Sequence, residues 1–504
     1  MLTQHLPILP IIFPMLMGAL LLLPPLGTNL QRQRITALIS GVLLVALAIW
    51  LLQVSHLEGT QLYFLGDWKP PFGILFVADR VSALLVLLTA VLALGAMLYA
   101  TGGEDRVGMH FYPLFMFQIT GINGAFLTGD LFNLFVFFEV LLIASYSLLI
   151  HGGGKHRTQA GMHYVILNLV GSALFLFALG IIYGTLGTLN MADMAVRVHG
   201  LEEDQLALTK AGGLLLLLVF SLKAALLPLH FWLPRTYSAA SAPVAALFAI
   251  MTKVGIYSIY RVHTLAFGPE AGDVASLAQP WLWPFALLTL AIGTIGVLAS
   301  HSLRVLAANL VIISVGTLLV AAALESTEAM TAALYYLVHS TLISGALFLL
   351  ADAIGKQRGK PGDRLVRGRQ LKQPVLLGSA FFLAALIAVG MPPFSGFVGK
   401  LMLLQAADTP ATASWIWPAI LISGLASIVA LSRAGTTLFW RVSGDDPAAV
   451  TAPVLQMSGV WLLLLCSPLL VAFGGPVTEF MALAAEQLFD VQQFVDLILV
   501  SGAE

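Results

Sequence analysis

Five side chains that can carry charge interrupt the most apolar stretches of this sequence. Glu139, Lys223, Lys253, His339 and Lys400 each lie inside a long, largely apolar run. A Lys or Asp at the centre of a membrane-spanning helix costs about 2.5–3.5 kcal/mol, so such residues are functional candidates by default. A buried pair that fixes helix packing would explain any one of them alone. Five titratable groups together favour a relay that moves protons.

Further polar side chains share helical spacing with these five. Lys223 and His230 are seven residues apart, which is close to two turns and would place both on one helix face, with about 10 Å between their backbones. Lys253 and Tyr257 are one turn apart, and Tyr260 follows on the same face. We therefore add His230 and Tyr257 to the relay. For the histidines, the alternative is a core imidazole bonded to a neighbouring carbonyl.

The composition indicates that the solvent of this chain is lipid. Of its 504 residues, 59% are hydrophobic and only 10% are charged, whereas soluble domains carry about 25% charged residues. The net charge of -1 gives no reason to expect nucleic acid as a partner. The single cysteine, Cys466, cannot form an internal disulfide or a four-cysteine iron–sulfur site. We expect no metal and no cofactor.

The apolar runs predict an all-α, polytopic membrane protein. A spanning helix needs about 20 mostly apolar residues, and the alternation typical of barrel strands is missing. The polar breaks predict about 14 transmembrane helices. Their ranges are 6–26, 35–54, 81–100, 111–128, 131–150, 161–186, 212–233, 244–262, 281–300, 305–324, 331–354, 375–404, 415–440 and 454–473.

Basic residues predict the orientation of these helices. Lys and Arg gather in the odd-numbered loops, which are therefore expected to be cytoplasmic, so that both termini lie outside the cytoplasm. The same rule explains the basic stretch 356–372, for which a patch that binds nucleic acid or anionic lipid is the alternative. The run 6–26 has no preceding Lys or Arg, so we interpret it as a first span rather than a signal peptide. The amphipathic tail 477–500 predicts an interfacial helix.

Two expected spans contain helix-breaking residues. In the seventh, Pro228 follows Lys223; in the twelfth, the segment 390–396, with two consecutive prolines, precedes Lys400. Interrupted helices at corresponding places in two halves of a chain are typical of transporter sites, because the freed backbone groups must line a cavity. The broken helices 7 and 12 therefore indicate a pathway for an ion.

Pairs of similar residues recur at a nearly constant offset. The pairs His163 and His339, Lys223 and Lys400, and Lys253 and Arg433 are separated by 176, 177 and 180 residues. This spacing predicts two five-helix repeats, inverted relative to each other because each has an odd number of helices. The expected units are residues 1–110 (helices 1–3), 111–262 (first repeat), 281–440 (second repeat) and 441–504 (helix 14 and an amphipathic segment).

The sequence around these lysines resembles a known family. The run from Lys223 to Pro234, with Ala242-Pro243-Val244 and the segment 252–257, is similar to the core signature of the proton-antiporter superfamily. That superfamily includes antiporter-like subunits of respiratory complex I, membrane-bound hydrogenases and Mrp cation/proton antiporters. The segment 128–146 resembles the D-type subunit of the Mrp (Mnh or Pha) family. Complex I relatives usually have Trp where this chain has Phe138.

The resemblance implies roles for the candidate residues. Glu139 and Lys223 would be the interacting pair at the head of the unit, Lys253 the connecting residue, His339 a relay member and Lys400 the terminal proton site. Many members of the family have a Lys where this chain has Ser344. At Ser344 the link would therefore depend on His339 and ordered water.

The resemblance also implies a function and partners. We expect a proton-translocating subunit of a Na⁺/H⁺ or K⁺/H⁺ antiporter in the bacterial inner membrane, not an enzyme, surrounded by lipid and by other subunits of a six- or seven-subunit complex. Opposite charges at about 6 Å and a dielectric of 20 attract by roughly 2.8 kcal/mol, and one charge crossing 100 mV gains about 2.3 kcal/mol. Rearranging one pair could therefore move one proton. The alternatives are a membrane-arm subunit of a complex I-type or hydrogenase redox complex, and a structural scaffold.

Overall fold

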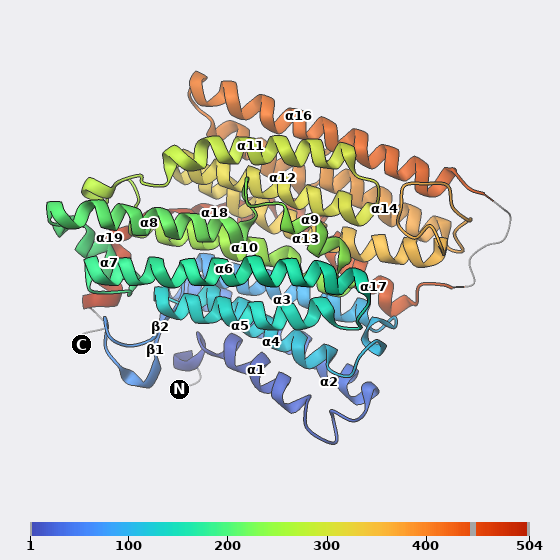
Figure 1. The fold of residues 1–504 in the computed structure, drawn as a ribbon, viewed down its shortest axis with the longest axis horizontal. Coiled ribbons are helices and arrows are strands. Elements are labelled where there is room, and N and C mark those ends of the chain that lie inside the picture. The colour runs from blue at the N-terminus through green and yellow to red at the C-terminus, as the bar shows by residue number, and fades with distance from the viewer. Residues whose placement is uncertain (1–2, 444–449, 501–504) are drawn as a thin grey trace.

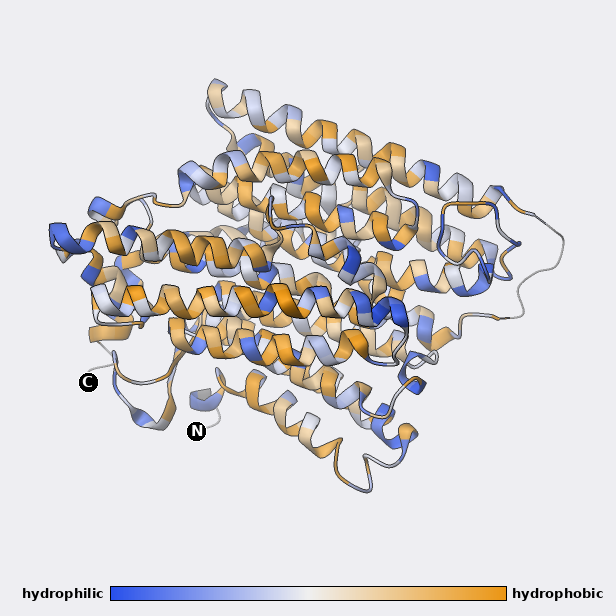
Figure 2. Cartoon of the chain, viewed as in Figure 1, coloured by the Kyte–Doolittle hydropathy of each residue, from blue (hydrophilic) through white to orange (hydrophobic). Residues whose placement is uncertain are grey.

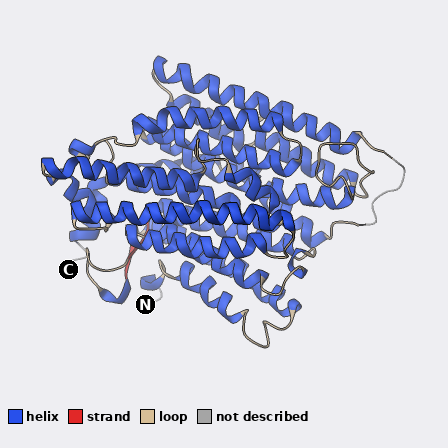
Figure 3. Ribbon diagram, viewed as in Figure 1, coloured by secondary structure: helices blue, strands red, loops and turns tan. Residues whose placement is uncertain are grey.

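The chain folds into a bundle whose long helices run roughly along one common direction (Figure 1). The computed structural model describes residues 3–443 and 450–500. Apolar residues cover most of the length of these helices, and hydrophilic residues gather near their ends (Figure 2). Within the described residues, the only strands form one antiparallel hairpin (Figure 3). The expected all-α membrane protein is confirmed.

The elements follow one another along the chain with short connections. The hairpin consists of β1 (Gln61–Phe64) and β2 (Leu75–Ala78), with Gln61 opposite Ala78. The helices are α1 (Leu9–Leu20), α2 (Leu30–Leu57), α3 (Arg80–Ala100), α4 (Phe111–Leu127), α5 (Leu131–Ile150), α6 (Lys155–Leu186), α7 (Met191–Arg197), α8 (Glu203–Ala224), α9 (Trp232–Ala239), α10 (Ala242–Leu265), α11 (Gln279–Ala299), α12 (Leu303–Leu324), α13 (Thr327–Arg358), α14 (Pro374–Val389), α15 (Ser395–Ala406), α16 (Pro410–Gly435), α17 (Val454–Ala472), α18 (Gly474–Phe489) and α19 (Val491–Val495).

Local side-chain chemistry determines where several helices begin. Asp79 accepts a hydrogen bond from the Ser82 backbone N–H, and the Ser82 hydroxyl accepts one from the Asp79 N–H, which forms a capping box at the start of α3. Asp130 caps α5 by accepting a 2.8 Å bond from the Asn133 N–H. Both caps satisfy amide groups that a helix start leaves without partners.

Eleven helices among the described residues are long and apolar enough to cross a membrane, judged by length and composition alone. Three of the fourteen expected spans are not among these eleven helices. Residues 6–26 form only the 12-residue α1, residues 111–128 form the 17-residue α4, and residues 375–404 form the separate helices α14 and α15. In the first case Pro24 and Pro25 follow α1, and proline cannot continue a helical hydrogen-bond ladder.

The most buried helices are α10 and α13. Every residue in the most apolar stretch of each is buried inside the protein, compared with 33% for α2 at the periphery. Helix α10 packs against α3, α8, α12 and α13. Lys253 on α10 and His339 on α13 therefore lie in the two helices that are farthest from lipid.

Both helix breaks lie where the sequence predicts them. Helix α8 ends at Ala224 and α9 begins at Trp232, while α14 ends at Val389 and α15 begins at Ser395. The residues that end the first member of each pair, Ala225 and Gly390, have φ of 62° and 81°. A left-handed residue stops α-helical hydrogen bonding and redirects the chain. The inverted relation between the two repeats stays a prediction.

The C-terminal segment differs from the predicted interfacial helix. Residues 474–489 form α18, which packs against α13, α3 and α10, and Met481, Ala484 and Leu488 are buried in these contacts. The side chain of Gln487 accepts a 3.1 Å bond from the Arg80 N–H at the start of α3. The apolar face of this amphipathic helix is therefore covered by protein, whereas the sequence pattern suggests lipid.

Candidate functional site

The first charge cluster spans α5, α6 and α8. The hydroxyl of Ser172 on α6 donates a hydrogen bond to the Glu139 carboxylate on α5. One turn earlier on α6, the Asn168 side-chain oxygen accepts a 3.0 Å bond from Nζ of Lys223 on α8. In the described part of the chain, Glu139 and Lys223 form no direct ion pair, and each bonds a different side chain of α6. Polar side chains of α6 therefore connect to both predicted charges.

Asn168 and Ser172 were missed by the sequence reasoning. They are four residues apart, so they lie on the same face of an otherwise apolar helix. That spacing is the signal that would have identified them. Both side chains are at least nine-tenths buried, and an amide and a hydroxyl of this kind can stabilise either the charged or the neutral form of a neighbour.

Three features of its surroundings favour a positive charge on Lys223. The residue lies in the last turn of α8, where the negative end of the helix dipole attracts a cation. Its Nζ is 5.9 Å from the centre of the Phe138 ring, within range of a cation–π contact. The Asn168 oxygen supplies the direct hydrogen bond. Because Lys223 is only 6% exposed, these partners replace water.

The break after Lys223 corrects the expected position of His230. Since α8 ends at Ala224, Lys223 and His230 do not share one helix face, and the spacing argument for this pair was wrong. His230 is half-buried, and its Nδ1 atom has no hydrogen-bond partner among the described residues. The carbonyl of Leu222 accepts a 3.1 Å bond from the indole N–H of Trp232 in addition to the bond from the Ala225 N–H. A relay role for His230 stays a prediction, and the helical spacing from Lys223 no longer supports it.

Lys253 lies at the centre of the bundle. Its side chain is completely buried on α10, and its Nζ donates to the hydroxyl of Ser314 on α12 at 3.0 Å and to that of Thr252 at 3.4 Å. Neither partner carries a charge. Hydroxyl groups therefore replace water around this ammonium group, and its connecting role stays a prediction.

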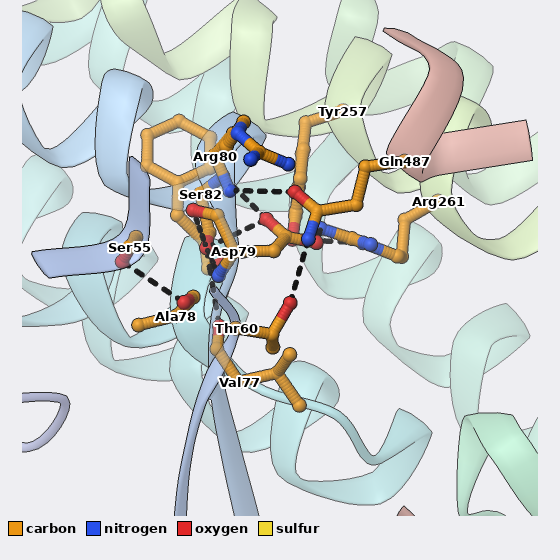
Figure 4. A network of polar contacts seen from close by, with 11 residues as sticks. Ser55, Thr60, Val77, Ala78, Asp79, Arg80, Ser82, Tyr257, Arg261 and Gln487 are labelled. Atoms are coloured by element: carbon orange, nitrogen blue, oxygen red, sulfur yellow. Dashed lines mark hydrogen bonds and ion pairs between the residues drawn. The ribbon is translucent and has the colours of Figure 1, made fainter. Parts of the chain in front are cut away.

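Tyr257 bonds to groups other than Lys253. Its hydroxyl donates to the Phe126 carbonyl at 2.7 Å and accepts a 3.1 Å bond from Nε of Arg261. Arg261 forms an ion pair with Asp79, and both side chains are at least 96% buried (Figure 4). The sequence reasoning placed Arg261 among the basic loop residues and so missed this pair. Tyr257 belongs to this network, and its relay role stays a prediction.

His339 lies at the second helix break. Its Nδ1 is 2.9 Å from the hydroxyl of Ser395, the first residue of α15, which is 2.7 Å from the hydroxyl of Ser467 on α17. A cavity of about 10 Å³ adjoins these three side chains, close to the smallest space that holds one water. A histidine with hydroxyl partners can pass a proton from one ring nitrogen to the other. Ser395 and Ser467 were also missed by the sequence reasoning.

Lys400 uses a carbonyl that the second break sets free. Its Nζ donates a 2.9 Å hydrogen bond to the backbone oxygen of Val389, the last residue of α14. Helix α14 ends there, so this oxygen has no partner within its own helix. The break that the sequence predicts therefore supplies the acceptor for Lys400, and the role of Lys400 as the terminal proton site stays a prediction.

Two further candidates have structural partners. The hydroxyl of Ser344 donates a 2.6 Å bond to the Ser340 carbonyl one turn earlier on α13, so its relay role stays a prediction that no contact supports. Arg433 donates to the carbonyls of Leu298 and Ser300 at the end of α11. Within the described residues, no group of three or more His, Cys, Asp or Glu side chains could hold a metal ion.

The comparisons with known proteins cover most of the chain. Residues 128–429 match the family described as "NADH:quinone oxidoreductase/Mrp antiporter, TM". The chain is 40% identical to the probable K⁺/H⁺ antiporter D-type subunit of Rhizobium meliloti, over 96% of each protein. It is 38% identical to the Na⁺/H⁺ antiporter D-type subunit of Bacillus subtilis, over 98% of this chain and 99% of that protein.

Solved structures show the same fold. A chain of the Mrp complex from Dietzia sp. superposes with a TM-score of 0.87 and 25% identity, covering 99% of this chain and 100% of that one. A chain of respiratory complex I from Thermus thermophilus superposes with a TM-score of 0.78, also at 25% identity, over 96% of this chain and 99% of that one. The helix arrangement is therefore shared by antiporter and respiratory complexes.

Proposed function

The chain belongs to the family of NADH:quinone oxidoreductase and Mrp antiporter membrane subunits, and we propose that it translocates protons as the D-type subunit of a multisubunit Na⁺/H⁺ or K⁺/H⁺ antiporter. The observation that carries this proposal is the set of three lysines inside the bundle: Lys223 and Lys253 are buried, and Lys400 is half-buried. Each ammonium group bonds only to neutral atoms, and Glu139 adds a carboxylate at one end. Ionisable side chains inside a membrane cost free energy, and where they occur they mark paths for ions or protons.

The mechanism begins with Glu139 and Lys223. When the Glu139 carboxylate approaches Lys223, it stabilises the ammonium form; when it stays with Ser172, Lys223 has only Asn168 and the Phe138 ring. Bringing the charges to about 6 Å at a dielectric of 20 stabilises the protonated Lys223 by roughly 2.8 kcal/mol. Separating them releases that proton toward Lys253. The proton crosses the gap between the clusters on water.

The second half continues the path. From Lys253 and Ser314 the proton passes to His339, whose contacts with Ser395 and Ser467 reach the broken helix. Lys400 on the far side of that break is the terminal site. On this proposal the two halves, residues 111–262 and 281–440, are inverted repeats that each supply one broken helix and one lysine.

The remaining parts of the proposal concern the assembly. The relatives are named as single subunits of antiporters, so we infer that other membrane subunits surround this chain and carry the monovalent cation. We place it in the bacterial inner membrane with both termini outside the cytoplasm, on the distribution of Lys and Arg. A membrane arm of a redox complex is the alternative. The curated relatives at 38–40% identity favour the antiporter.

The test is transport by the whole complex in liposomes without NADH or quinone. A gradient of Na⁺ or K⁺ should drive proton movement that a trapped pH-sensitive dye reports, and the preferred cation follows from comparing the two. This chain alone should give no cation-dependent signal. Proton movement that requires a redox substrate and ignores both cations would instead establish the membrane-arm alternative.

A further inference from the structure

The interface between α10 and α12 continues beyond Lys253 as a row of polar contacts. Lys253 bonds Ser314, and two turns farther along α10 the Tyr260 hydroxyl donates a 2.7 Å bond to the Leu318 carbonyl on α12. Both helices advance in the same direction, so this row leads from the bundle centre toward the ends at Leu265 and Leu324. None of the proposed proton steps uses this half of the interface.

A buried histidine without partners lies at the end of this row. His263 is only 6% exposed, and neither of its ring nitrogens has a hydrogen-bond partner among the described residues. Burying both polar atoms of an imidazole without partners is costly, and native proteins normally satisfy such groups with protein or water. The two ring nitrogens are therefore available to a water or to another polar group beside them.

The histidine faces a small cavity together with a carboxylate. The cavity has a volume of about 20 Å³, which is enough for one water molecule. Tyr260, Thr264 and Glu325 supply its polar lining beside His263, and the remaining neighbours from α11, α13 and α18 are apolar: Leu282, Met330 and Phe489. One water there would have the two to four polar partners that a buried water needs.

Glu325 is the acidic member of this cavity. It follows the last residue of α12 with φ of 48°, and its carboxylate accepts a 2.7 Å bond from the Ser276 hydroxyl. Burial raises the pKa of the Glu325 carboxyl above its ordinary value, and the Ser276 bond opposes this effect. The nearby Arg261 is committed to Asp79 in the separate buried pair. Glu325 is thus the carboxylate available to His263.

A larger cavity reaches the protein surface next to the first one. It has a volume of about 390 Å³, and its lining includes the exposed residues His199 and Glu270. Thr264 lines both cavities. Thr264 therefore adjoins both the buried His263 site and the cavity that opens to the surface.

We propose that His263 and Glu325, bridged by one water, form a second proton-exchange site that connects Lys253 to the aqueous side reached through the larger cavity. The proposal rests on the proposed function. A proton from that side binds one ring nitrogen of His263 as the other nitrogen releases its proton toward Tyr260 and Lys253, and Glu325 stabilises the intermediate imidazolium. No bond other than those to hydrogen changes.

The experiment uses the whole complex with His263→Gln or Glu325→Gln. Each variant should assemble normally, keep the KM for the cation, and lower the rate of proton exchange at least tenfold, with a changed dependence on the pH of the side that the larger cavity faces. Glu325→Asp should keep at least half of the rate. The exposed His156→Gln is the matched histidine control and should keep the wild-type rate and pH profile.

Two outcomes would overturn the proposal or its premise. Wild-type rates and pH profiles in both His263→Gln and Glu325→Gln reject this site, provided that Glu139→Gln, measured in parallel, is inactive. If Glu139→Gln is active as well, the proposed proton path through this chain, on which the inference rests, has failed. Should His263→Gln not assemble, Glu325→Gln, at a half-buried position beyond the helix, decides the question.

Discussion

The two interrupted helices hold their lysines in opposite ways. At the break between α8 and α9, Lys223 comes before the interruption and bonds the side-chain oxygen of Asn168, with Glu139 on a nearby helix. At the break between α14 and α15, Lys400 follows the interruption and bonds the backbone oxygen of Val389. One lysine therefore has movable side-chain partners, and the other has a fixed dipole.

This difference suggests a division of labour. A carboxylate that moves between Ser172 and Lys223 brings a full negative charge toward the lysine or takes it away. This movement changes the electrostatic energy of the protonated lysine, so the first break can act as a switch. A backbone carbonyl cannot change its charge. At the second break, proton affinity depends on burial and on access of water to Lys400. We therefore predict that antiport is lost when the charge at the first break is removed. At the second break, we predict that antiport is lost even when the lysine is replaced by another cation.

The largest effect should follow from Glu139→Gln, which keeps the size of the side chain and removes its charge. Loss of about 2.8 kcal/mol of attraction corresponds to at least about a hundredfold slower antiport. Antiport is measured by dye fluorescence in inverted vesicles. Asp130→Asn is the matched control on the same helix, because Asn also caps helices well and the cap bond of Asp130 to Asn133 can be kept. Near-normal antiport in Glu139→Gln would contradict the proposed switch.

Lys400→Arg should have the next largest effect. Arginine keeps the positive charge and a donor for the Val389 carbonyl, but it does not release its proton in proteins. The complex should assemble, while antiport falls about tenfold or more across pH 7 to 9. Unchanged antiport would make Lys400 a fixed structural charge, and the contrast between the two breaks would lose its basis.

Asn168→Leu should give an intermediate effect. A hydrogen bond to a charged group contributes about 1.5–3 kcal/mol, so removing the Asn168 partner of Lys223 should slow antiport about tenfold. The optimum should move to lower pH, because the ammonium form of Lys223 loses a stabilising partner. An unchanged pH profile would show that α6 only packs between the two charges.

The smallest effects on the antiport rate should come from two serines near His339, and these effects should differ. Ser395→Ala removes the hydroxyl bonded to the histidine and should slow antiport about two- to tenfold, the range for a neutral hydrogen bond. Ser344→Ala removes only a bond to its own helix and should change the rate less than twofold. Equal effects of both substitutions on the antiport rate would contradict the proposed path through the second break.

Much of the site could be predicted because charge in an apolar run is a strong signal. Glu139, Lys253 and Lys400 were identified in this way, and prolines indicated both helix breaks. The position of His230 relative to Lys223 was predicted wrongly, because helical spacing was applied across residues that do not form a helix. Helical periodicity in a sequence does not show where tertiary contacts end a helix.

The neutral partners were harder to predict. Asn168, Ser172 and Ser314 carry no charge, and such residues also occur in membrane helices as packing groups. The ion pair of Arg261 with Asp79 joins residues far apart in the sequence, so neither residue indicates the other. Which polar side chain meets which charge depends on packing that a single sequence does not display.

Lys253→Met in the reconstituted complex tests the central claim most directly. Lys253 is fully buried and bonds Ser314 and Thr252, and on the proposed path every proton passes through it. Methionine is similar in size, and it removes a buried charge without leaving an unpaired one. A cation gradient should then move no protons through an assembled complex, as reported by the trapped pH-sensitive dye. Proton movement at the wild-type rate would contradict the account.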